Sequence, residues 1–162
     1  MIDAEHLRSV VVKGLKEYIG VAVIRSNQNA EPPDYPYVSY TITTPESANN
    51  GTYGVYEDGV DRLPVTQTWS ITVQSDKYDE SLMLASKARE WLQHAGTLYL
   101  NDNDVIVQSV TNITNRDNLI SVEYEYKHGF DCVFWLMNEV ERQVEQIETI
   151  NIEEYGINVS KN

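Results

Sequence analysis

Basic side chains are scarce in this sequence, which has 12 lysines and arginines against 25 aspartates and glutamates. The formal net charge is therefore −13 at pH 7. Sequence-independent affinity for nucleic acids comes from basic groups that displace counterions, and anionic membranes attract the same groups. The composition consequently argues against a protein that grips DNA, RNA or a membrane surface. Acidic residues exceed basic ones in each of the segments 1–78, 79–137 and 138–162, so we expect an acidic surface overall.

Cysteine and long hydrophobic runs are also nearly absent. Cys132 is the single cysteine, which excludes an intrachain disulfide framework, and its neighbours Phe130, Val133 and Phe134 predict a buried, inert thiol. The first residues, MIDAEHLRSVVVKGL, mix charges into an apolar run, and no window approaches the ~20 apolar residues of a membrane span. We therefore expect no signal peptide, no membrane anchor and synthesis in the cytoplasm.

Motifs that carry chemistry are missing as well. The chain has no glycine-rich phosphate loop, no nucleophile elbow and no Cys/His pair, and its three histidines are scattered. Asp102-Asn103-Asp104 resembles the start of a calcium loop, but Ile106 and Val107 follow where ligands and a glycine belong. The sequence thus predicts no enzyme, no catalytic residue, no cofactor, no metal site and no small-molecule substrate.

What the chain does contain is the material for one folded domain. It has 162 residues, 41% of them hydrophobic, with 11 tyrosines. Apolar residues at helical spacing predict a helix over Asp3–Tyr18, ended by Gly20. A second helix, capped by Asp76 or Asp79, is predicted to run to about Ala95. Its inner stripe is predicted to comprise Leu82, Ala85, Ala88, Leu92 and Ala95, with Leu84 and Trp91 beside it.

Alternating apolar and polar residues predict the strands. The first four are Val21–Arg25, Tyr37–Thr44, Pro64–Ser75 and Thr97–Leu100. Val105–Thr114 and a segment beginning at Leu119 follow, separated by turn-forming residues, so we expect a closing meander. Together with the helices, this order predicts an α+β fold: a mainly antiparallel sheet, two helices packed on it and a long loop after the second strand.

The predicted long loop covers Pro45–Leu63. It carries three glycines and two adjacent asparagines, and it reads either as a loop or as two extended arms with Asn50-Gly51 at the tip. Loops of this length in compact domains are usually functional or disordered. Tyr53, Val55 and Tyr56 give this loop aromatic and apolar side chains, which favour binding to another surface more than a plain spacer would.

The longest β signal is Leu119–Met137, LISVEYEYKHGFDCVFWLM. One face alternates from Ile120 to Leu136, while the other changes from Glu123, Glu125 and Lys127 to Val133, Trp135 and Met137. The second half is therefore apolar on both sides and needs a cover, either the chain's own C-terminal part or another subunit. Gly129 lies at the changeover, where we expect a bulge or bend.

The C-terminal region is weakly patterned. Asn138–Thr149 allows a short helix, and Ile150–Glu153 alternates like a strand. We expect a single α+β domain over residues 1–152, including the loop at 45–63, and a flexible tail over 153–162.

Exposed aromatics and methionine are typical of protein interfaces. Intrachain packing is the alternative explanation for the same residues. The residues predicted to lie at a subunit or tail interface are Asn50, Gly51, Tyr53, Val55, Tyr56, Val133, Trp135 and Met137.

The order of elements resembles that of phage tail terminator proteins, also called neck terminator or tail completion proteins. The local matches are the Pro33–Tyr37 entry, the strand-to-helix passage over Trp69–Ala88, the YKHGFDCVF stretch at Tyr126–Phe134, and Ile147–Ile150. The resemblance covers roughly residues 4–152 and rests on element order and on aromatic or glycine positions.

This resemblance implies a structural component of the virion, made in the host bacterium. Such subunits assemble as a ring, commonly a hexamer, that stops growth of the tail tube and offers the surface to which the head or neck docks. The implied partners are other copies of the chain, the tail tube and head-neck connector proteins, with DNA only in transit through the channel. Two alternatives remain at this point: another neck, connector or tail-tube component, and a small binding module with exposed aromatics.

Overall fold

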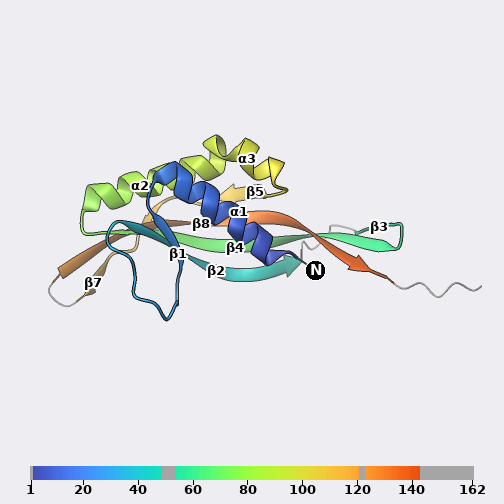
Figure 1. Cartoon of the computed structure of the whole chain (residues 1–162), viewed down its shortest axis with the longest axis horizontal. Coiled ribbons are helices and arrows are strands. Elements are labelled where there is room, and N and C mark those ends of the chain that lie inside the picture. Colours follow the sequence, from blue (N-terminus) through green and yellow to red (C-terminus); the bar gives the residue numbers. More distant parts are fainter. Residues whose placement is uncertain (1, 49–53, 121–122, 143–162) are drawn as a thin grey trace, which may run out of the picture.

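A computed structural model describes residues 2–48, 54–120 and 123–142 of the chain. Figure 1 shows an open, twisted sheet with the helices gathered on one of its sides. β1 (Ala22–Arg25) runs parallel to β2 (Tyr37–Ala48), whereas every other pairing between described strands is antiparallel. The predicted α+β class with a mainly antiparallel sheet is confirmed.

Two long strands form the centre of the sheet. β4 (Val60–Ser75) and β8 (Glu123–Glu141) pair from Val60 opposite Glu141 to Ser75 opposite Tyr126 without a register shift. β2 and then β3 (Val55–Glu57) follow the other edge of β4. β5 (Ile106–Val110), β6 (Thr114–Asn115) and β7 (Asn118–Ile120) follow one another along the other edge of β8. The resulting strand order, β1-β2-β4-β8-β5, leaves β1 and β5 at the two edges.

The first helix, α1 (Ala4–Ile19), begins and ends where the sequence predicts. The side chain of Asp3 accepts a hydrogen bond from the backbone N–H of His6 at 2.9 Å, and Gly20 follows the last turn. The face turned to the sheet is apolar, and its buried residues are Leu7, Val10, Val11, Gly14, Leu15 and Ile19.

The second helix, α2 (Tyr78–Glu90), differs in its cap and its buried face. Neither Asp76 nor Asp79 caps it. The Ser75 hydroxyl instead accepts a hydrogen bond from the backbone of Lys77 and donates one to Glu80, which joins the end of β4 to the first helical turn. The predicted inner stripe is wrong at Leu82 and Ala95, which are exposed. The residues that α2 and the next turn bury are Ser81, Leu84, Ala85, Ala88, Trp91 and Leu92.

The strand predicted over Thr97–Leu100 is wrong, because this segment belongs to a helix. After α2 the chain makes a π-helical turn, η1 (Trp91–Ala95), and continues as α3 (Thr97–Asp102). Leu100 is buried in the core, and the Tyr99 hydroxyl donates to the carbonyl of Val10 on α1. Packing against α1 therefore overrides the β preference of Thr-Leu-Tyr-Leu.

β8 passes through Gly129 without the predicted bulge, since Gly129 stays in register opposite Thr72. The glycine instead makes room for another side chain. A Cβ atom at this position would lie 2.6 Å from the carbonyl oxygen of Ile71 and 2.8 Å from a guanidinium nitrogen of Arg116. Gly129, where the apolar pattern of the strand changes, thus marks a close approach of Arg116 to the backbone rather than a bend of the strand.

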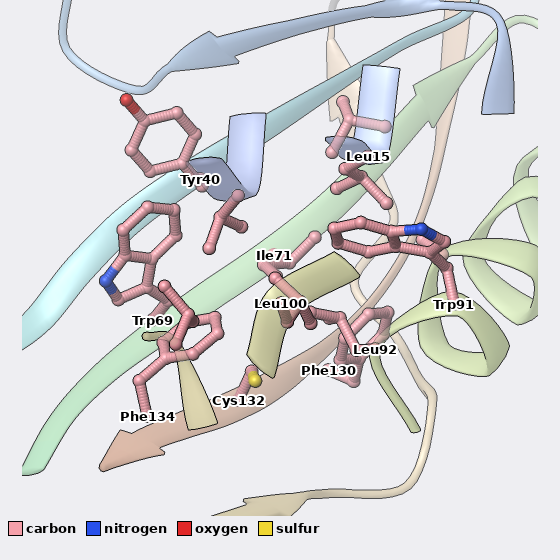
Figure 2. Packing of buried hydrophobic residues seen from close by; sticks show 14 of the residues in the cluster. Leu15, Tyr40, Trp69, Ile71, Trp91, Leu92, Leu100, Phe130, Cys132 and Phe134 are labelled. Carbon is pink, nitrogen blue, oxygen red and sulfur yellow. The ribbon is translucent and has the colours of Figure 1, made fainter. Parts of the chain in front are cut away.

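The core lies between the helices and one face of the sheet. Trp69 of β4 stacks on Tyr40 with ring centroids 4.6 Å apart and meets the edge of Phe134 at 5.2 Å. Cys132 of β8 is fully buried beside them, and this burial raises the pKa of its thiol, as the predicted inert role requires. Figure 2 shows these side chains packed together with Ile71, Leu100 and Phe130.

The C-terminal helix predicted from Asn138 is wrong in its first part, because Asn138–Glu141 complete β8. The remainder of that prediction, the strand at Ile150–Glu153 and the tail over 153–162 lie outside the described residues. Glu125, predicted on a wet strand face, is buried. It pairs with Lys127 at 3.1 Å and accepts a hydrogen bond from the Tyr35 hydroxyl.

Candidate functional site

The central strands continue well past the core. Val65 of β4 and Leu136 of β8 form the last buried pair, and five more pairs follow, ending at Val60 opposite Glu141. We call residues 54–64 and 137–142 the arm. Figure 1 shows it projecting beyond the helices at one end of the sheet, next to the label β3. The segment predicted as a long loop is thus mostly strand: β2 reaches Ala48, and β3 and β4 form a hairpin.

The tip of the arm is a two-residue turn at Asp58-Gly59. Both residues have positive φ angles, 52° and 79°, and Asp-Gly is a preferred pair for the type I′ turn that needs them. The predicted tip, Asn50-Gly51, lies outside the described residues, and the segments on either side of it follow the same edge of β4. The reversal of the chain is therefore at Asp58-Gly59.

Charged pairs link the three strands of the arm on both of its faces. On one face, Nε of Arg62 donates to Glu139 of β8 at 2.9 Å, and the same guanidinium lies 3.9 Å from Glu57 of β3. On the other face, Arg142 pairs with Asp61 at 2.7 Å and lies over the ring of Tyr56, 5.2 Å from its centroid. Exposed pairs stabilise little individually, but together these connect every strand of the arm.

Between these charges the arm exposes apolar side chains to solvent. Each keeps between 40% and 59% of its surface accessible. Clustered apolar residues of this kind mark surfaces that bind other proteins. The exposed apolar residues of the arm are Val55, Tyr56, Leu63, Met137 and Val140.

A second apolar area adjoins the arm on the sheet face opposite the helices. Trp135 lies between Thr66 of β4 and Ile106 of β5, and Val133 and Met137 are its neighbours on the same face of β8. Val133 and Trp135 are half-buried, whereas Ile106 and Met137 are exposed. We call Ile106, Val133, Trp135 and Met137 the outer strip. On β4 the neighbouring positions of this face are the polar residues Thr66, Thr68, Ser70 and Thr72.

Arg116 covers another part of the sheet face opposite the helices, farther from the arm than the outer strip. Its guanidinium donates to Ser70 at 2.7 Å and Thr72 at 2.9 Å on β4, and pairs with Asp131 of β8 at 3.2 Å. Gly129 lies beneath it. The chain thus closes one part of the outer face with its own side chain, and the outer strip lies beyond that cover.

Five of the eight predicted interface residues lie on these two surfaces. Val55, Tyr56 and Met137 belong to the arm, and Val133, Trp135 and Met137 to the outer strip. Asn50, Gly51 and Tyr53 lie outside the described residues. Their role at an interface stays a prediction.

Sequence reasoning missed three exposed members of these surfaces: Leu63, Ile106 and Val140. The Asp58-Gly59 pair was the available signal for the hairpin that exposes Leu63. Val140 lies in a stretch whose apolar spacing also suits a helix, and Ile106 lies in a strand with ordinary alternation. Neither pattern indicated an interface residue.

His128 and Asp131, two groups that could take part in catalysis, lie on opposite faces of the sheet. The His128 ring faces the core, where Nδ1 lies 3.0 Å from the Ser81 hydroxyl, while Asp131 points to the opposite face and pairs with Arg116. Within the described ranges, no group of three or more His, Cys, Asp or Glu side chains is arranged to hold a metal ion. Over the same ranges, no helix has the length and apolarity needed to cross a membrane.

Two comparisons with known proteins bear on the family of this chain. No curated protein matches the chain significantly. The sequence model that describes phage neck terminator proteins matches residues 9–160. Such proteins are structural parts of the phage neck rather than a class of enzymes, and they interact with other tail and head proteins. Because the match spans nearly the whole chain, this protein belongs to the phage neck terminator family.

Proposed function

We propose that this protein assembles into a ring that terminates the tail tube and offers the docking surface for the head. The resemblance to tail terminators implies a hexamer. In the proposed ring, the arm and the outer strip make contacts between subunits or with the tail tube.

The observation that carries this proposal is the arm itself. It extends five residue pairs past the last core pair, and it exposes apolar side chains to solvent. A small antiparallel sheet without a covering layer is marginally stable by itself, so such an arm is best explained as a part that packs on another molecule. A closed ring needs two complementary surfaces on each subunit, because its interfaces are head-to-tail.

The acidic surface supports the same proposal. DNA must pass through the neck without adhering to it, and like charge repels phosphate groups. A net charge of −13 is consistent with a channel wall that repels DNA. In this proposal, DNA is in transit and is not a ligand.

The geometry argues against a small aromatic binding module. Such a module would need Tyr56 and Trp135 on one concave patch. Tyr56 is opposite Asp61 and shares the face of Arg142, whereas Trp135 is opposite Thr66 on the face away from the helices. The two rings therefore lie on opposite faces of the sheet.

The test replaces one exposed apolar residue of the outer strip and one far from it. Met137→Glu adds a charge where the strip meets the arm, and Leu98→Glu adds the same charge on α3, at a leucine that is 79% exposed. Met137 is 41% exposed, so its further burial contributes only part of the about 1.5–3 kcal/mol of a whole side chain, and the new charge would also have to be desolvated. Met137→Glu should therefore weaken assembly about tenfold. Leu98→Glu should leave assembly unchanged, and circular dichroism should show both variants folded.

Assembly is measured by light scattering coupled to size exclusion and by negative-stain imaging, with and without preformed tail tubes. The expected result is a ring that caps tubes and stops their growth. A protein that extends tubes would instead be a tail-tube component. A wild-type chain that stays monomeric at every concentration and does not cap tubes would refute the proposal.

A further inference from the structure

The few basic residues of this acidic chain are unevenly placed. Figure 1 shows α1 passing over the region of β1, and a groove of about 550 Å³ lies between these two elements. Every lysine and arginine in the first 61 residues lines this groove, together with one acidic residue, Glu5. These basic residues are Arg8, Lys13, Lys16 and Arg25.

Among the described residues, the four cations of the groove have no acidic partner. In the described part of the chain, the lysines and arginines that form ion pairs are Arg62, Arg116, Lys127 and Arg142. None of the groove cations approaches a carboxylate within 4.0 Å there. A cluster of unpaired charge of one sign, in a chain whose overall charge has the opposite sign, indicates a surface that meets an acidic partner.

The groove also has an apolar lining, and one of its walls is an edge strand of the described part of the sheet. Val12, Val23 and Tyr40 line it beside the basic groups. Burial raises the pKa of the Tyr40 phenol, and the charges of Arg8 and Arg25 oppose that rise, so both guanidinium groups act on this hydroxyl. Figure 2 shows the hydroxyl directed away from Trp69 and the core. β1, on the groove wall, pairs with β2 along one edge and ends the strand order.

The arm has the complementary properties. It carries five acidic and two basic side chains, a net charge of −3 against +3 for the groove lining. Both of its arginines are already paired within the arm, whereas Glu141 is exposed and Asp58 forms the tip. Its exposed Val55, Tyr56 and Val140 match the apolar lining of the groove. Its edge strand β3 pairs with β4 alone among the described strands.

We propose that the arm of one subunit docks into the α1–β1 groove of the next copy of this chain. This inference rests on the proposed ring and identifies its two complementary surfaces. The contact is head-to-tail, since arm and groove are different surfaces, and a head-to-tail contact repeated around an axis closes a ring. Salt should weaken it, because the charges at its rim are exposed.

Nucleic acid is the other acidic macromolecule that such a groove could meet. The observations favour a second copy for two reasons. The whole-chain charge of −13 repels a polyanion, whereas the short arm brings only a few acidic groups to the groove. The arm also supplies apolar side chains for Val12 and Val23, which a phosphate backbone does not.

The experiment exchanges the charges of the two surfaces. One variant reverses the groove, Lys13→Glu with Arg25→Glu; another reverses the arm, Glu57→Lys with Glu141→Lys; all four positions are exposed. A third chain carries all four substitutions and keeps the wild-type net charge. The control for the groove variant, Lys77→Glu with Lys87→Glu, makes the same change in net charge as that variant, on α2 and the residue before it. Circular dichroism and thermal unfolding verify that each variant folds.

Each single-surface variant should raise the midpoint concentration for ring formation about tenfold or more, because like charges then face each other. The four-substitution chain should recover most of the wild-type midpoint, and the control should match wild type. Mixing the two single-surface variants should also restore assembly, since each supplies the surface that the other lacks.

The outcomes separate this inference from the proposed function. A wild-type chain that never forms rings contradicts the proposed function and the docking together. A wild-type ring with a groove-reversed variant that assembles equally well, or a four-substitution chain without recovery, overturns the docking alone. A groove-reversed variant that assembles normally but loses binding to duplex DNA, measured by fluorescence anisotropy, also overturns it in favour of nucleic acid.

Discussion

Replacing Gly129 with alanine tests how the outer face is closed. The new Cβ atom would lie 2.6 Å from the carbonyl oxygen of Ile71 and 2.8 Å from both the Thr72 hydroxyl and Nη1 of Arg116. The carbonyl belongs to β4, which is paired with β8 along its whole length, so it cannot retreat without disturbing the central ladder. The guanidinium can move, but only by giving up its hydrogen bonds to Ser70 and Thr72.

The expected loss of stability has two parts. Overpacking against fixed atoms costs ~1–3 kcal/mol, and a lost hydrogen bond to a charged group costs ~1.5–3 kcal/mol when it is buried. Arg116 is partly exposed, so we take the lower part of the second range. We therefore expect Gly129→Ala to lower the free energy of unfolding by about 2–4 kcal/mol and Tm by roughly 5–15 °C.

The assay is urea and thermal unfolding, followed by tryptophan fluorescence and circular dichroism. The matched control is Gly54→Ala, whose Cβ would meet the end of the exposed, flexible Leu63 side chain at 2.5 Å and should cost little. A double-mutant cycle with Arg116→Ala isolates the guanidinium contact, because the clash with Arg116 is then absent and the clash with Ile71 remains. A loss under about 0.5 kcal/mol for Gly129→Ala, or full additivity with Arg116→Ala, would refute the reasoning.

Two further predictions concern single side chains. The buried Cys132 thiol, whose pKa is raised by desolvation, should not react with a thiol reagent in the native protein, and its labelling should follow unfolding in urea; prompt native labelling would contradict its position in the core. Burial and the hydrogen bond to Glu125 raise the pKa of Tyr35 to about 12 from 10.0, so the folded state favours the neutral phenol. This contribution is complete below pH 10 and is lost as the pH rises toward 12. Tyr35→Phe should therefore flatten the decline of stability that urea unfolding measures between pH 10 and pH 12. Tyr124→Phe, at an exposed position, should leave that decline unchanged. Equal declines in both variants would contradict the role of Tyr35.

Local patterns were sufficient where a segment's own chemistry decides its structure. The Asp3 cap, the apolar stripe and Gly20 predict α1 almost to the residue. The strict alternation from Val65 to Val73 likewise predicts which side of β4 enters the core. In both cases the side-chain period of the element matches one buried face, so the pattern survives folding.

Local patterns failed where a distant segment decides. The β preference of Thr97–Leu100 yields to packing on α1, which makes the segment helical. Glu125 looks solvated in an alternating strand, but Tyr35, ninety residues earlier, bonds to it. A glycine inside a strand predicts a bulge. Gly129 instead leaves room for the guanidinium of Arg116, which belongs to another segment and is not visible in the pattern of the strand.

The candidate surfaces divide in the same way. The chemistry of Tyr56, Trp135 and Met137 was enough to predict them as interface residues, and the structure places them on the arm and the outer strip. The limits of the arm were not, because a strand looks the same whether or not a helix layer covers it. The basic groove could not be predicted from the sequence either, because α1 and β1 contribute its cations separately and only their packing places these cations together.

The sequence by itself determined the α+β class, the excess of acidic residues, the burial of the single cysteine and the resemblance to tail terminators, because composition, periodicity and local order carry that information. The tertiary structure alone decided where the core stops, at Val65 and Leu136, and therefore which length of β4 and β8 is free to meet another molecule. The physical reason is that burial depends on which elements pack together, and that is a property of contacts between residues far apart in the chain.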